Sequence, residues 1–177
     1  MTVTPTPVGL LRRLGAAVSD SLVIFALLAL ATLIVFVPLL TVLGKRVMAP
    51  DEVGWPLYGL YLLSMLGLWF GFYGYFWGRS GQTLGMRAWR IRIEACDGSL
   101  LNWRASLRRW TAAWLPWMPA LVTLGIADHL DSSGLKALGL GLLLIGVMGL
   151  LMIYKSAERL TWHDQISNSR VILLPER

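Results

Sequence analysis

The chain has one cysteine and two histidines in 177 residues, and few charged side chains. Cys96 alone cannot close an internal disulfide, and it has no second cysteine with which to hold a metal. Charged residues make up 15% of the sequence, against roughly 25% in an average soluble domain, which excludes an ordinary soluble protein. Hydrophobic residues reach 56% and the mean hydropathy is +0.62, values typical of a membrane protein.

Sequence motifs for catalysis are absent as well. The chain has no G-x-S-x-G elbow and no H-E-x-x-H pair. His163 precedes Asp164, but His129 lies in a segment expected on the opposite side of the membrane, so it cannot complete a site. We therefore expect a protein that is not an enzyme and that uses neither a metal nor a cofactor.

Four apolar stretches predict membrane helices, because about 20 apolar residues cross the hydrocarbon core. We expect spans at residues 14–43, 57–77, 111–127 and 137–154, within one domain covering residues 1–177. The first stretch is too long for a signal-peptide core and no clear cleavage site follows it, so we expect it to be retained.

Two of the spans contain residues that shape helix packing. Pro116 and Pro119 predict that the short third span is kinked or partly re-entrant. Small residues at helical spacing predict a close helix contact along the second span. These residues are Gly67, Gly71, Gly74 and Gly78.

Positive charge is concentrated in three segments. Residues 78–110 carry seven arginines against two acidic residues, Arg12 and Arg13 precede the first span, and Lys155 and Arg159 follow the fourth. The connections at 44–56 and 128–136 carry little net charge. With four spans all three basic segments lie on one side, which the positive-inside rule identifies as the cytoplasm. Both termini are therefore expected in the cytoplasm.

The basic middle segment contains signs of regular structure. WRIRIEA alternates like a strand and is followed by an Asp-Gly turn signal, which together predict a short hairpin. Asn102 is a candidate cap for a helix that has Trp103 and Trp110 on one face, typical of an element at the membrane interface. The fold class expected is an all-α membrane protein with four transmembrane helices and a basic cytoplasmic segment that holds this hairpin and helix.

The arginines of this segment have two interpretations. They bind lipid headgroups or a nucleic acid, or they form a solvated, lipid-facing surface that only fixes the topology. We favour lipid over nucleic acid as the partner. The expected headgroup or interface contacts are Arg87, Arg90, Arg92, Arg104, Arg108 and Arg109.

Asp20 stands at the start of the first apolar run, seven residues after Arg13. Seven helical steps bring both side chains to nearly the same face, roughly 10 Å apart along the axis. One interpretation is a boundary residue that suits the positive end of the helix dipole. The other is half of a functional site, since charged residues in spans usually face protein or water.

Three motifs resemble those of the RDD family of bacterial integral membrane proteins, named for one arginine and two aspartates. They are RRLGAAVSD, GQTLGMRAWRIRIEACDGSLLNWRASLRR and LTWHDQISNSRVIL, in the family's order. The resemblance implies that the named residues are Arg13, Asp20 and Asp164. It also implies a location in the bacterial cytoplasmic (inner) membrane and transport of ions or small solutes.

Two functions follow from these observations. The first is a transporter or channel-like subunit for a cation, a proton or a small solute, in which Arg13, Asp20 and Asp164 form an ion or proton site. The alternative is a scaffold or assembly partner that transports nothing, in which the same residues form a structural latch. Because four short spans enclose little volume, we expect a homo-oligomer or a larger membrane partner, in a bilayer with anionic headgroups.

Overall fold

The computed structural model describes residues 6–44 and 53–175, and three of its helical stretches are long and apolar enough to cross a membrane. The first, Leu10–Val42, combines α1 (Leu10–Ala31), the π-helical turn η1 (Thr32–Phe36) and α2 (Val37–Val42). The others are α4 (Trp55–Arg79) and α8 (Ser133–Leu151), which continues into η2 (Met152–Tyr154). At most 22% of the apolar window of any of them is buried, which leaves broad apolar surfaces for lipid.

The stretch predicted as a span at residues 111–127 is divided in two. α6 (Trp103–Trp114) ends before Pro116, and α7 (Trp117–His129) begins after it, since proline lacks the N–H that would continue a helix. α7 has 13 residues, so it is about 20 Å long, less than the hydrocarbon core of about 30 Å. The predicted kink is thus a complete break between two helices, and three rather than four described helices have the length of a span.

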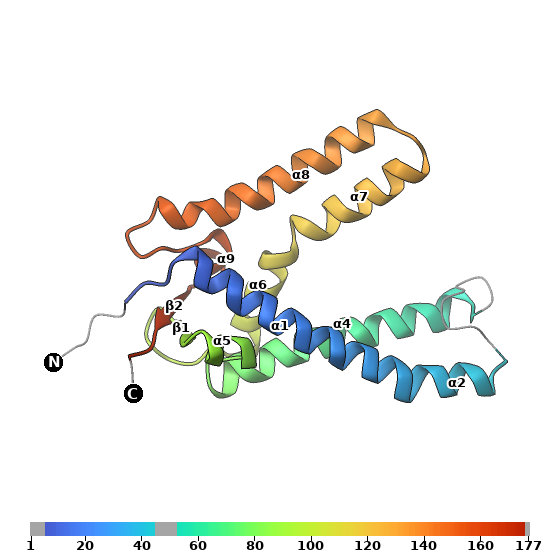
Figure 1. Ribbon diagram of the computed structural model, residues 1–177, viewed down its shortest axis with the longest axis horizontal. Helices are drawn as coiled ribbons and strands as arrows, with labels where there is room; N and C mark the ends of the chain where they lie inside the picture. The colour runs from blue at the N-terminus through green and yellow to red at the C-terminus, as the bar shows by residue number, and fades with distance from the viewer. Residues whose placement is uncertain (1–5, 45–52, 176–177) are drawn as a thin grey trace.

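Two helical hairpins diverge from one end of the molecule (Figure 1). One pairs α1 and α2 with α4, and the other pairs α7 with α8. Between them, at their common end, lies a group of short elements that we call the head. The head consists of α5 (Leu84–Ala88), β1 (Ile91–Ala95), α6, α9 (Trp162–Ile166) and β2 (Ser169–Leu173).

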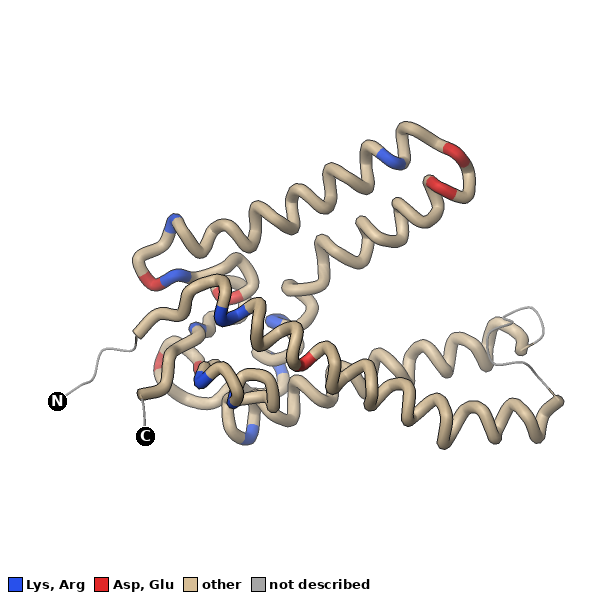
Figure 2. Tube along the Cα trace, viewed as in Figure 1, with Lys and Arg blue, Asp and Glu red and all other residues tan. Residues whose placement is uncertain are grey.

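Charged residues gather at the head, whereas the hairpins carry few of them, most of these at the far end of the α7–α8 hairpin (Figure 2). The described ends of the chain lie beside the head as well (Figure 1). This arrangement brings the three basic segments of the sequence to one end of the molecule. Most of the predicted loop at 44–56, including Lys45, Arg46, Asp51 and Glu52, lies outside the described residues.

The strand in the basic middle segment pairs with the tail and not with a neighbouring strand. β1 and β2 are antiparallel, with Ile93 opposite Val171, so the predicted local hairpin is wrong. The Asp-Gly turn does form, and Gly98 takes a φ of 85° there. After the turn the chain enters α6, because Asn102 caps this helix by accepting a hydrogen bond from the Ala105 N–H at 2.8 Å.

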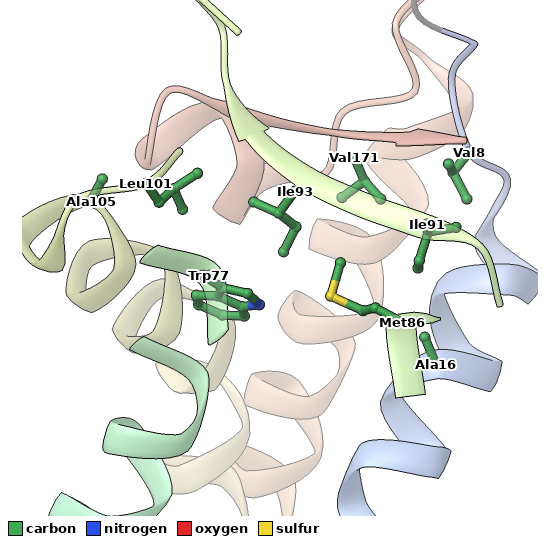
Figure 3. Close-up of a cluster of buried hydrophobic side chains, with 9 residues drawn as sticks. All are labelled: Val8, Ala16, Trp77, Met86, Ile91, Ile93, Leu101, Ala105 and Val171. Carbon is green, nitrogen blue, oxygen red and sulfur yellow. The ribbon is translucent and has the colours of Figure 1, made fainter. Parts of the chain in front are cut away.

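The buried hydrophobic core lies where the head meets α1 and α4. Figure 3 shows that side chains from β1 and β2 point toward Met86 of α5 and Trp77 of α4. Of the glycines of α4, Gly74 packs directly against the ring of Trp103, whereas Gly67 and Gly71 have open space beside them. Among the described residues of one chain, the predicted close contact is therefore found at the end of α4 nearest the head.

Candidate functional site

Asp164 is held in place by the start of α9. Thr161 is the N-cap residue, and its backbone N–H and its hydroxyl both donate to Asp164 Oδ2 at 2.8 Å. The backbone N–H of Asp164 in turn faces the Thr161 side chain, and this reciprocal arrangement is a capping box, which accounts for the T-W-H-D spacing in the tail. The position of the Asp164 carboxylate is therefore set by neighbouring residues as well as by its contacts with distant parts of the chain.

Two arginines from distant parts of the chain meet this carboxylate. Arg13 Nη1 of α1 lies 2.5 Å from Oδ2, and Arg109 Nη1 of α6 lies 2.5 Å from Oδ1. The second contact is an ion pair and not an aligned hydrogen bond; Arg109 Nη1 donates instead to Ser169 Oγ at 2.6 Å. We call Arg13, Arg109 and Asp164 the Asp164 cluster.

The Asp164 cluster is closed to solvent. The side chain of Asp164 is 0% exposed, that of Arg109 is 5% exposed and that of Arg13 is 10% exposed. The guanidinium of Arg109 also stacks over Trp77, with 5.6 Å between its carbon and the ring centroid. A carboxylate buried in this way depends on both arginines to offset the cost of leaving water.

The electrostatics of the cluster leave it with one excess positive charge. Burial alone raises the pKa of Asp164, but the charges of Arg109 and Arg13 outweigh it and hold this pKa well below its ordinary value. Burial, with a further contribution from Arg109, lowers the pKa of His163 to about 3, so this imidazole is neutral at pH 7. Two guanidinium groups therefore face a single carboxylate.

Asp20 has different partners from the Asp164 cluster. Its Oδ2 accepts a hydrogen bond from the Thr83 hydroxyl at 2.5 Å, and its Oδ1 accepts one from the Gly85 N–H at 2.8 Å. It is 2% exposed and holds the first turn of α5 against α1. A Cβ on Gly85 would lie 2.5 Å from the Ala16 carbonyl oxygen, which explains the second glycine of the G-Q-T-L-G motif.

The three residues expected to form one site are thus divided. The structure brings Arg13 and Asp164 together, while the carboxylate of Asp20 bonds to α5. Arg109, grouped in the sequence with the headgroup contacts, is instead buried and takes the place expected for Asp20. Its position could have been recognised, because Arg109 lies on the same face of α6 as the small residues Ala105 and Ala112, a face suited to burial.

The other expected headgroup arginines differ in exposure. Arg87, Arg104 and Arg108 are exposed at the head, beside the exposed rings of Trp89 and Trp103. Half-buried Arg90 donates to the Leu174 carbonyl oxygen at 3.2 Å, and Arg92 is also half-buried. Exposed arginines next to exposed indoles are typical of a surface at the membrane interface.

A cavity of about 430 Å³ adjoins both charged sites. Arg13, Arg109 and His163 line it near the tail, and Asp20 and Tyr73 line it between α1 and α4. Most of the other lining side chains are apolar or aromatic. Within the described ranges, no three histidine, cysteine, aspartate or glutamate side chains come together as a metal site.

One protein family matches most of the chain. The model of the RDD family matches residues 7–168, which include Arg13, Asp20, Arg109 and Asp164. The chain belongs to the RDD family. Searches of curated proteins and of solved structures found no match. The RDD match and the apolar helices together indicate a membrane protein, and Asp20, Glu94, Arg109 and Asp164 are the buried charged residues in the described part of this RDD chain.

Proposed function

We propose that this RDD protein is a multi-pass scaffold or assembly partner in the bacterial inner membrane, and that the Asp164 cluster is its structural latch. The observation that supports this function best is the burial of Asp164 between two arginines. A carrier needs a carboxylate that water and the transported ion can reach in turn. Asp164 has no exposed surface and a lowered pKa, which suits a permanent ion pair better than an exchange site.

The latch joins three segments that are far apart in the sequence. Arg13 belongs to the first span, Arg109 to α6 and Asp164 to the tail. Arg13 adds two contacts, since its Nη2 donates to the Arg159 carbonyl oxygen at 2.8 Å and its Nε to the Val8 carbonyl oxygen at 3.3 Å. Loss of any one member of the cluster would therefore loosen the attachment of the head to the hairpins.

The proposed topology places the head in the cytoplasm, with four crossings and both termini on that side. The concentration of arginine and lysine at the head supports this orientation (Figure 2). α7 is short for a crossing, but it runs beside α8 and continues from α6, whose N-terminal half carries the exposed arginines. Cysteine labelling from outside cells tests the topology at the connection between α7 and α8.

Transport remains the second candidate function, and one observation favours it. Asp20 lies on the wall of a cavity of about 430 Å³, so a small solute, a cation or a proton could reach this carboxylate. Against this, both oxygens of Asp20 already accept hydrogen bonds from α5. A transport function would thus use Asp20 and the cavity, and not the Asp164 cluster.

Flux measurements in vesicles that contain only this protein separate the two functions. Proton flux under an imposed cation gradient is compared for the parent chain, Asp20→Asn and Asp131→Asn, a control at a carboxylate that is 97% exposed. The scaffold function predicts that all three match vesicles without protein. Flux in the parent and in Asp131→Asn that is lost in Asp20→Asn would contradict the scaffold and establish transport.

A scaffold is also expected to form a homo-oligomer or to bind a larger membrane partner. The apolar faces of α1, α4 and α8 are mostly unburied within one chain, so they are available for neighbouring helices as well as for lipid. Light scattering of the purified protein in detergent should give the mass of a multimer. A mass equal to one chain, together with no partner retained after cross-linking in cells, would contradict this part of the proposal.

A further inference from the structure

The cavity beside the Asp164 cluster is apolar along most of its wall. Leu14, Trp110, Trp114, Trp117 and Leu150 contribute to it, so α1, α6, α7 and α8 all take part. Its volume of about 430 Å³ is in the range of sites that hold small organic molecules. Leu14 is 42% exposed, so the wall formed by α1 reaches the apolar outer surface of the first span.

Near the tail the same cavity carries unbalanced positive charge. Arg13 and Arg109 both line it, and Asp164 is their common acidic partner. Among the described residues no other carboxylate pairs with either arginine, and His163 is neutral. The carboxylate of Asp20, farther along the wall, is bonded to α5. Near the tail, among the described residues, two buried guanidinium groups thus share one carboxylate, and a bound anion would add a second partner for them.

Hydrogen-bond donors without partners are found on the same cavity wall. Arg109, which is 4% exposed, uses one nitrogen, Nη1, for both its hydrogen bond and its ion pair. The indole N–H groups of Trp77 and Trp110, both on the cavity wall, have no acceptor there. Figure 3 shows the indole nitrogen of Trp77 on the side of Met86 and Ile93, which also line the cavity. A ligand rich in acceptors would satisfy such groups.

We propose that this cavity binds an anionic phospholipid, with its phosphate near Arg109 and part of one acyl chain among the tryptophans. The apolar wall and its continuity with the lipid-facing surface of α1 favour a lipid over a soluble anion. The excess positive charge favours an anionic headgroup over a zwitterionic one. The site requires only that the chain is embedded in a membrane, so it is compatible with either candidate function. Bound lipid would brace the latch between the two hairpins.

The experiment measures lipid retention by native mass spectrometry of the full chain in detergent. Phosphatidylglycerol, phosphatidylcholine and inorganic phosphate are added separately, and phosphate is also added as a competitor. Ala113→Phe fills the cavity without altering a charge, and Ala157→Phe makes the same change at an exposed position that does not line it. Arg109→Gln removes the proposed anion contact, with exposed Arg108→Gln as its control.

We expect one phosphatidylglycerol per chain, retained by the parent, Ala157→Phe and Arg108→Gln. Ala113→Phe and Arg109→Gln should weaken retention by about tenfold, which corresponds to about 1.4 kcal/mol. If Arg109→Gln does not fold, Ala113→Phe decides the outcome alone. Equal retention of phosphatidylcholine, or unchanged retention by Ala113→Phe, would show only lipid around the surface and would overturn the site. Displacement of the lipid by inorganic phosphate would identify a soluble-anion site and also overturn the proposal.

Discussion

Replacing Arg109 by alanine should destabilise the protein far more than replacing its neighbour Arg108. Arg109→Ala removes the ion pair with Asp164, the hydrogen bond to Ser169 and the stacking over Trp77. Removing one partner of a buried ion pair costs about 3–5 kcal/mol, because the remaining charge loses its compensation. Here Arg13 still faces the carboxylate, which places the expected loss near the lower end, about 3 kcal/mol.

Arg108 provides a matched control on the same helix. Arg108 is exposed, so Arg108→Ala should lower the free energy of unfolding by less than about 1 kcal/mol, as expected for a surface charge. Thermal unfolding in detergent, followed by circular dichroism, should show a Tm lower by roughly 10 °C for Arg109→Ala and by no more than a few degrees for Arg108→Ala. Equal effects of the two substitutions would refute the reasoning that Arg109 carries the latch.

Three further predictions concern neighbouring residues. Arg13→Ala should lower the Tm more than Arg12→Ala, because only Arg13 contacts Asp164, and equal losses would contradict this contact. Gly85→Ala should destabilise by about 1–3 kcal/mol in chemical unfolding, since its Cβ would lie 2.5 Å from a backbone oxygen; an unchanged midpoint would show that α5 can shift. The stability of the parent should fall as the pH drops from about 6.5 toward 3. In this range His163 binds a proton in the unfolded chain but not in the folded chain, where the pKa of His163 is about 3. His163→Gln should flatten the upper part of this profile whereas His129→Gln should not, and equal profiles would contradict the assignment. Asp164 adds to the loss only below its ordinary pKa, since its own pKa is lowered in the fold.

Local signals in the sequence were sufficient for much of this fold. Runs of apolar residues predicted four spans, of which three have spanning length in the structure; Pro116 marked the interruption of the other, and Asn102 marked the start of a helix. These features depend on residues close together in the chain, so hydropathy, capping and the missing proline N–H suffice to predict them. The contact between Arg13 and Asp164 could be predicted from the family resemblance and from the expectation that both residues lie on the same side of the membrane.

The partners of Asp20 and of β1 depend on tertiary contacts and could not be predicted from the sequence. The seven-residue spacing put Arg13 and Asp20 on one stripe of α1, but α5 docks on that stripe and takes the Asp20 carboxylate through Thr83 and Gly85. The strand β1 found its partner in the tail, because β2 supplies Val171 to the same core as Ile93. Both outcomes depend on pairing between distant segments, which spacing along the chain does not encode.

Hydrogen–deuterium exchange of the tail tests the central claim that Asp164 is a structural latch. Asp164→Asn keeps the size of the side chain and an oxygen that can accept from the Thr161 N–H, but it removes the charge that faces two arginines. The latch predicts that amides of α9 and β2 exchange about 100-fold faster in this variant, equivalent to about 3 kcal/mol of lost local stability. In Asp164→Asn, the exchange of α8 should match the parent. In the exposed control Glu158→Gln, the exchange of α9 and β2 should match the parent as well. Unchanged protection of α9 and β2 in Asp164→Asn would contradict the account.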